Sequence, residues 1–101
     1  VKASGLSLGF ADAAAAAAAQ QMPADFRVSI TNAEGKEAYP VASFTWLLVP
    51  ANISDPAKKK AITEFIQWML ADGQTMTEAL FYARLPKEVV AMEHKAVALI
   101  Q

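Results

Sequence analysis

Cysteine is absent from the 101 residues, histidine occurs once, and neither sign of charge dominates. Without cysteine the chain has no disulfide, no thiolate zinc site and no cysteine nucleophile, and one histidine excludes the two-histidine spacings of zinc hydrolases. Nine Lys plus Arg against ten Asp plus Glu give no extended basic surface, which argues against binding to nucleic acid. The composition therefore predicts no metal, no cofactor and no nucleic acid partner.

The sequence also lacks a basic, apolar signal segment and any apolar run of about 18 residues that would span a membrane. It begins at Val1, and we expect a processed or excised piece of a longer protein whose targeting information lies elsewhere. The hydrophobic share is 54%, above the usual ~45–50%, although a short chain has more surface to cover and should be more polar. We expect a partner to cover the excess apolar surface.

The first half contains an alanine-rich stretch followed by two apolar segments. Seven consecutive alanines within 4–21 predict a helix that ends before Pro23, with low-complexity disorder as the alternative. Apolar and polar residues alternate from Phe26 to Thr31, which predicts a short strand with one buried face, and the turn residues of Asn32–Gly35 predict a reversal. The nearly continuous apolar run Val41–Val49 predicts a strand covered on both faces.

The second half predicts three helical segments. Asp55 followed by Pro56 is a typical helix start, and we expect a helix over Pro56–Asp72 that ends with Gly73 in the left-handed region. A short helix is expected over Thr75–Leu80, and a last helix from Pro86. Apolar residues at helical spacing mark the faces that we expect to be buried: Ile62, Phe65, Ile66 and Met69 in the first helix, and Val89, Met92, Ala96, Val97 and Ile100 in the last.

Residues with catalytic or anion-binding chemistry are few. His94 lies opposite the apolar stripe of the last helix and is interpreted as a solvated side chain. No strained strand-turn-helix surrounds Ser43, so a triad of Ser43, His94 and an aspartate is not supported, and we predict that the chain is not an enzyme. Lys58–Lys60 fan out around one helical turn, which favours a solvated face over a phosphate or acidic-lipid site.

The aromatic residues raise a choice between a stacking platform and a core. Their spacings place most of them on the predicted buried stripes, so the sequence favours the core. The residues concerned are Phe44, Trp46, Phe65, Trp68 and Tyr82.

Several stretches together resemble the C-terminal third of the periplasmic phosphate-binding proteins of phosphate ABC transporters. The more specific ones are Tyr39-Pro40 followed by Ser43, and Tyr82-Ala83 followed by Leu85-Pro86. The whole set is Val1–Ser4, Phe26–Asn32, Gly35–Val41, Ser43–Pro50, Phe65–Leu70, Asp72–Gln74 and Leu80–Val90. The resemblance covers essentially the whole chain in the right order.

This resemblance implies an α/β fold in which two lobes close on phosphate. Family members are roughly three times as long as this chain, and their phosphate ligands come from segments that it lacks, so no phosphate-binding residue is carried over. Residues 1–36 are expected to end the second lobe, 37–40 to form a crossover at the hinge, and 41–101 to return to the first lobe. The resemblance then gives four candidates for hinge residues, or for side chains that hold the phosphate-contacting residues in position: Tyr39, Pro40, Ser43 and Thr45. For Ser43 and Thr45 the alternative is a hydroxyl satisfied within the sheet.

We therefore expect a short mixed sheet with about three to four helices, completed by self-association through strand pairing or swapping. The leading functional hypothesis is the C-terminal fragment of a phosphate receptor that delivers inorganic phosphate to an ABC importer permease, in the periplasm or lipid-anchored at the cell surface. The isolated chain is predicted not to bind phosphate. The alternatives are an independently folding, self-associating module and a receptor for another oxyanion, sulfate or molybdate.

Overall fold

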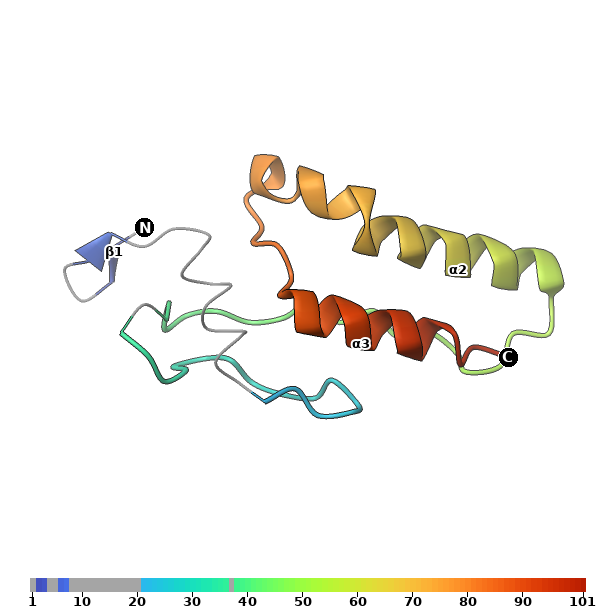
Figure 1. Cartoon of the computed structure of the whole chain (residues 1–101), viewed down its shortest axis with the longest axis horizontal. Helices are drawn as coiled ribbons and strands as arrows, with labels where there is room; N and C mark the ends of the chain where they lie inside the picture. Colours follow the sequence, from blue (N-terminus) through green and yellow to red (C-terminus); the bar gives the residue numbers. More distant parts are fainter. Residues whose placement is uncertain (1, 4–5, 8–20, 37) are drawn as a thin grey trace.

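The computed structural model describes residues 2–3, 6–7, 21–36 and 38–101. The regular elements of its described part are mainly helices, joined by long irregular segments, and Figure 1 shows α2 (Pro56–Leu70) and α3 (Lys87–Val97) running alongside each other. The elements are β1 (Lys2–Ala3), β2 (Leu6–Ser7), α2 (Pro56–Leu70), the 3₁₀ helices η1 (Asp72–Met76) and η2 (Glu78–Leu80), and α3 (Lys87–Val97). None of the helices among these residues has the length and apolar character that crossing a membrane requires.

The predicted mixed α/β sheet is wrong. Strand pairing in the described ranges is confined to the two-residue antiparallel pair of β1 and β2, in which Lys2 faces Ser7 and Ala3 faces Leu6. The predicted strands over 26–30 and 41–49 are irregular. The helix predicted over 4–21 falls mostly outside the described residues, and Leu6 and Ser7 within that range belong to β2.

The segment from Phe26 to Thr31 keeps the expected alternation of burial without a ladder. Ile30 is 3% exposed, while Arg27 and Ser29 point to solvent. Phe26 has a φ of 59°, a left-handed value that interrupts any strand, and the Asp25 carboxylate accepts a hydrogen bond from the Arg27 N–H at 3.1 Å. Local side-chain bonds of this kind compete with sheet formation when no neighbouring strand is present.

The predicted chain reversal after this segment is confirmed. Asn32, in the left-handed region at φ 54°, donates its N–H to the Pro40 carbonyl at 2.7 Å. The Thr31 hydroxyl donates to the Ala42 carbonyl at 3.3 Å. Ile30 and Ala42 meet across the reversal and form a small buried cluster with Tyr39 and Phe44 beside it.

Helix α2 begins as its sequence predicts. The Asp55 carboxylate accepts from the backbone N–H groups of Ala57 at 2.9 Å and Lys58 at 3.2 Å, and Pro56 occupies the first turn, where a missing N–H costs nothing. Lys60 and Glu64 form an ion pair one turn apart on the exposed face.

The end of α2 differs from the prediction at Gly73. The helix ends at Leu70, and Gly73 lies inside η1 rather than in the left-handed region, which among the described glycines only Gly35 occupies. A Cβ at Gly73 would stand 3.3 Å from the Trp68 carbonyl oxygen and 3.6 Å from the Trp68 ring. Glycine is therefore favoured here by the close approach of Trp68.

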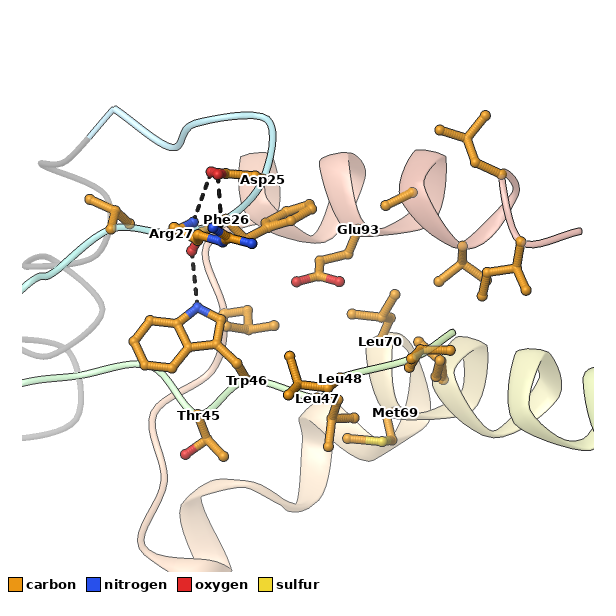
Figure 2. Close-up of a pocket in the computed structure, with 18 of the residues that line it drawn as sticks. Asp25, Phe26, Arg27, Thr45, Trp46, Leu47, Leu48, Met69, Leu70 and Glu93 are labelled. Atoms are coloured by element: carbon orange, nitrogen blue, oxygen red, sulfur yellow. Dashed lines mark hydrogen bonds and ion pairs between the residues drawn. The ribbon is translucent and has the colours of Figure 1, made fainter. Parts of the chain in front are cut away.

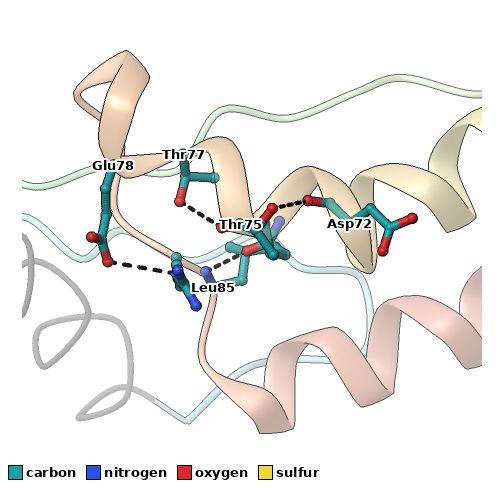
Figure 3. A network of polar contacts seen from close by, with 7 residues as sticks. Asp72, Thr75, Thr77, Glu78 and Leu85 are labelled. Carbon is teal, nitrogen blue, oxygen red and sulfur yellow. Dashed lines mark hydrogen bonds and ion pairs between the residues drawn. The ribbon is translucent and has the colours of Figure 1, made fainter.

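The connection between α2 and α3 is organised by the Gln74 side chain. Figure 3 shows the polar contacts of this connection around Thr75, Thr77 and Leu85. The Gln74 amide nitrogen donates to the Met69 carbonyl at 3.0 Å, and its amide oxygen accepts from the Leu85 N–H at 2.9 Å. One side chain thus joins the end of α2 to Leu85, two residues before α3 begins. The predicted short helix over Thr75–Leu80 is present as the two turns η1 and η2.

The main core lies between α2 and α3. Ile66 and Leu70 of α2 pack against Val97 of α3. Partly buried apolar residues surround them: Val49, Ile62, Leu85, Val90 and Ile100. The apolar stripe predicted for α3 is confirmed, since Val89 and Val97 are buried. In α2 the prediction fails at Phe65, which is exposed and stacks on Trp68 with ring centroids 6.0 Å apart.

Two backbone hydrogen bonds join the last residue to the segment before α2. The Gln101 N–H donates to the Ala51 carbonyl at 2.8 Å, and the Ile53 N–H donates to the Gln101 carbonyl at 2.7 Å. Residues 51 and 101 are therefore neighbours in space.

Substitution of Asp55 tests the start of α2. Asp55→Ala leaves two helix N–H groups without their side-chain acceptor, so we expect a loss of about 1 kcal/mol in the free energy of unfolding. Urea unfolding followed by far-ultraviolet circular dichroism measures this loss. Ser54→Ala, at the exposed preceding residue, is the matched control and is expected to leave stability unchanged. Equal effects of the two substitutions would contradict the capping role.

Candidate functional site

A mainly apolar groove lies between two irregular segments, 25–29 and 43–49, and the helical pair. Its volume is about 840 Å³, and its walls come from 25–29, 43–49, the end of α2 and the second half of α3. Figure 2 shows Leu47, Leu48, Met69 and Leu70 gathered around the open space. Pockets of roughly 300–1,000 Å³ with few polar groups are typical of binding sites.

One hydrogen bond connects the two irregular walls. The Trp46 indole N–H donates to the Phe26 carbonyl at 2.9 Å, as Figure 2 shows. On the same wall as Phe26, the Arg27 guanidinium lies 3.7 Å from the Asp25 carboxylate. These two charges offset each other at the rim and are both solvent-exposed.

Glu93 brings a carboxylate into the groove. Its side chain projects from α3 toward the space between Trp46 and Leu70 in Figure 2. Desolvation by the surrounding apolar residues raises the pKa of Glu93 above its ordinary value. No hydrogen bond or ion pair joins its carboxylate to another residue in the described ranges, so nothing there offsets the cost of burying the charge.

The 43–49 wall also presents backbone groups. None of its N–H or C=O groups forms a backbone hydrogen bond with another described residue. Its side chains are largely exposed, and Leu48 reaches 96% exposure. The predicted strand with both faces covered is therefore wrong for this structure, because the described part of the chain supplies no neighbouring strand and no second covering layer.

The four candidate residues named from the sequence fall into two places. Ser43 and Thr45 are exposed and line the groove, while Tyr39 and Pro40 are half-buried at the chain reversal, where Tyr39 packs on the Ile30 cluster. The structure thus brings Ser43 and Thr45 together on one wall and leaves Tyr39 and Pro40 outside it.

The other residues considered from the sequence stay on the surface. His94 is exposed, and so are Lys58 and Lys60. No histidine lines the groove, so no histidine base faces Ser43 there. In the ranges that the structure describes, no group of three or more His, Asp or Glu side chains has the arrangement of a metal site.

The core placement predicted for the aromatic residues is wrong for four of five. Only Phe44 is partly buried, with its ring edge toward Trp46 at a centroid distance of 6.4 Å. Large apolar side chains are widely exposed in the described ranges: Val41, Trp46, Leu47, Leu48, Phe65, Trp68, Met76, Leu80, Phe81, Tyr82 and Leu99. Exposed apolar side chains that form a contiguous patch are typical of contact sites for proteins, membranes or ligands.

Glu93 is the site residue that the sequence interpretation missed. The signal was present, since Val89, Glu93 and Val97 follow one another at intervals of four and therefore share one helix face. A carboxylate in the middle of an apolar stripe is costly unless it is paired, hydrogen-bonded or protonated.

Comparison with known proteins relates the chain to phosphate-binding proteins. It is 36% identical over 66 residues to the phosphate-binding protein PstS of Xylella fastidiosa strain Temecula1, a match that covers 65% of this chain and 18% of that protein. The PstS of Xylella fastidiosa strain 9a5c is 35% identical over 66 residues, with the same coverage. The PstS of Methanocaldococcus jannaschii is 39% identical over 75 residues, which covers 69% of this chain and 19% of that protein.

The resemblance inferred from the sequence is thereby confirmed, and the chain is related in sequence to these PstS proteins. It spans about a fifth of the length of the curated relatives it matches. No family model matches the sequence. No solved structure matches it either.

The pH dependence of stability tests the environment of Glu93. Because its folded pKa is raised, the folded state binds the proton more tightly than the unfolded state, so stability is greatest below the unfolded pKa and is lost as pH rises through the folded pKa. Glu93→Gln removes the charge, and we expect a higher melting temperature at pH 7 and a smaller gain on acidification. The other charges lining the groove, Asp25 and Arg27, are retained in this variant.

Thermal unfolding between pH 4 and pH 8 measures this effect. Glu88→Gln is the matched control, because Glu88 is exposed in the first turn of α3, where the helix dipole favours a negative charge. Its removal is expected to lower stability slightly. A melting temperature of Glu93→Gln at or below that of the parent chain at pH 7 would contradict the desolvated position of Glu93.

Proposed function

We propose that this chain is the C-terminal part of a receptor that binds inorganic phosphate and delivers it to an ABC importer. The observation that carries the proposal is the sequence match to three proteins named phosphate-binding protein PstS, which covers about two thirds of the chain. The receptor works by binding and delivery, without catalysis, in the periplasm or lipid-anchored at the cell surface. Its partners are phosphate and the permease of the importer.

Within such a receptor, residues 1–36 end the second lobe, 37–40 cross between the lobes, and 41–101 complete the first lobe. The chain reversal between Thr31 and Ala42 coincides with this crossover and supports its position. Pro40 fixes its own φ there, which limits the ways in which the crossover bends. Tyr39, packed on the Ile30 cluster, contributes to the same hinge.

Ser43 and Thr45 support the phosphate site without contacting phosphate. Both are exposed on the groove wall just beyond the crossover, so their hydroxyl groups are available to side chains or backbone of the rest of the receptor. A hydroxyl both donates and accepts, which suits it to orienting a neighbouring ligand-contacting group.

The isolated chain is proposed not to bind phosphate. Phosphate is strongly hydrated, and holding it requires several donors and opposing positive charge in a closed cleft. The groove offers Arg27, which is already paired with Asp25, and it also holds the Glu93 carboxylate, which repels an anion.

Calorimetric titration tests both halves of this proposal. With the 101 residues alone we expect no heat of phosphate binding, which means no site with a millimolar or lower dissociation constant. With the remaining receptor polypeptide added in trans, we expect micromolar or tighter binding once both lobes assemble. Sulfate and molybdate, titrated into the same mixture, test whether the receptor prefers another oxyanion. Micromolar phosphate binding by the isolated chain, or no binding by the complemented mixture, would refute the corresponding half.

The second candidate is an independently folding module that self-associates and binds no ligand. Its supporting observation is the number of exposed large apolar side chains, among them Leu47, Leu48 and Phe65, some of which a second copy of the chain would cover. Pairing between two copies of the 41–49 segment would also satisfy its backbone N–H and C=O groups.

Sedimentation velocity measures self-association directly. At high micromolar concentration we expect dimers, because a single exposed 41–49 segment gains both apolar burial and hydrogen bonds by pairing. The double substitution of Leu47→Ser and Leu48→Ser should raise the dissociation constant of the dimer at least tenfold. Met76→Ser, an exposed apolar residue in η1, is the control. A folded monomer at every concentration would exclude this candidate.

A further inference from the structure

The groove combines apolar walls with one charge that has no opposite charge beside it. Of the residues that line it, only Asp25, Arg27 and Glu93 carry charge, and Asp25 and Arg27 pair with each other at the rim. Glu93 lies on the α3 wall in line with buried Val89 and Val97, and its pKa is raised by desolvation. The groove therefore has a net negative centre in an apolar setting.

We propose that the groove receives a segment of the receptor polypeptide outside this chain, an apolar stretch with one Lys or Arg whose side chain pairs with Glu93. The inference rests on the proposed function and adds to it the chemistry of the contact between the two parts of the receptor.

The choice of a polypeptide follows from the 43–49 wall. This wall has the composition of a strand, it exposes Leu47 and Leu48, and its backbone forms no hydrogen bond to the described residues around it. An extended segment beside it gains backbone hydrogen bonds along its length and apolar contacts from alternate side chains. A small apolar molecule would satisfy the side chains and leave these backbone groups unchanged.

The requirement for a basic residue follows from Glu93. An apolar segment placed over a charged carboxylate would remove the remaining water from it and offer nothing in return, which is costly. Lys and Arg suit the position because their long aliphatic stems lie along apolar walls while the charged end reaches the carboxylate. Charge complementarity of this kind also fixes the register of the segment.

The choice of the receptor polypeptide over a second copy follows from length. The matches cover 18% or 19% of each PstS relative, so more than four fifths of those chains lie outside the matched region. A second copy of this chain in the groove is an outcome that the experiment distinguishes.

Overlapping 12-residue peptides provide the test. The peptides cover the PstS sequences of Xylella fastidiosa strain Temecula1 and Methanocaldococcus jannaschii outside the matched regions, and fluorescence anisotropy measures their binding to the 101-residue chain. We expect the peptides that bind to be apolar stretches that contain Lys or Arg. Glu93→Gln should weaken their binding about tenfold. Glu88→Gln, on the exposed side of the same helix, should leave it unchanged.

A double-mutant cycle makes the pairing specific. Replacing the basic residue of a bound peptide by norleucine should weaken binding to the parent chain about tenfold and have little effect on binding to Glu93→Gln. Because Glu93→Gln is expected to be the more stable protein, loss of binding by this variant is not explained by unfolding.

The proposal is overturned if no peptide binds, if the bound peptides lack basic residues, or if Glu93→Gln and Glu88→Gln bind them equally. It is also overturned if a second copy of the chain fills the groove. In that case the peptides would compete with dimerisation, and Glu93→Gln would change the dissociation constant of the dimer without changing the affinity for the peptides. Glu93-dependent peptide binding without phosphate binding in the complemented receptor would refute the proposed function and leave this inference standing.

Discussion

The packing of α2 against α3 through Ile66, Leu70 and Val97 is the contact on which the described structure depends. Burial of these three side chains holds the helices together, and the Gln74 amide then fixes the connection between them. Two walls of the groove are parts of this same helical pair. Loosening the pair would therefore alter the core and the groove together, because α2 and α3 supply the groove wall on that side among the described elements.

The helices could be predicted from the sequence because their determinants are local. The Asp55 cap, Pro56 and the apolar stripe of α3 act within a few residues, and each is found as expected. The strands could not, because a strand is stabilised by hydrogen bonds from neighbours that can be distant in sequence. The 41–49 segment has the composition of a strand, but no described neighbouring strand pairs with it. At Phe26–Thr31 the alternation of apolar and polar residues predicted correctly which side chains are buried, although the segment forms no sheet hydrogen bonds.

The candidate site shows the same division between local and distant determinants. Ser43 and Thr45 were placed beside a site by resemblance, and both line the groove, but their roles depend on groups outside the chain. Glu93 was accessible to a simple spacing argument, since it falls between Val89 and Val97 on one face of α3. The burial of Glu93 in the groove also depends on the opposite walls, 25–29 and 43–49. The spacing of residues within α3 does not predict where these walls lie. Exposed Phe65 also shows that an apolar stripe can extend beyond the face that a single chain buries.

Many apolar side chains of this protein are incompletely buried, at its surface and in its core. In the described ranges the buried apolar residues are few, and none of the large ones is fully enclosed, while Leu48 and Phe81 lie almost entirely in solvent. A polypeptide that covers these residues binds the folded state and not the unfolded one, so it stabilises the fold by mass action. Stability and partner binding are thus coupled through the same apolar area.

The backbone bonds between Gln101 and the Ala51–Ile53 segment have a consequence for chain connectivity. They bring position 101 back to position 51, so the helical half forms a nearly closed ring. Chain ends that lie close together allow circular permutation. In a polypeptide cut down to residues 51–101, these two positions would be the chain ends. A short linker from 101 to 51, with new ends opened at the exposed turn around Phe81, would there keep α2 and α3 in contact while reversing their order along the chain.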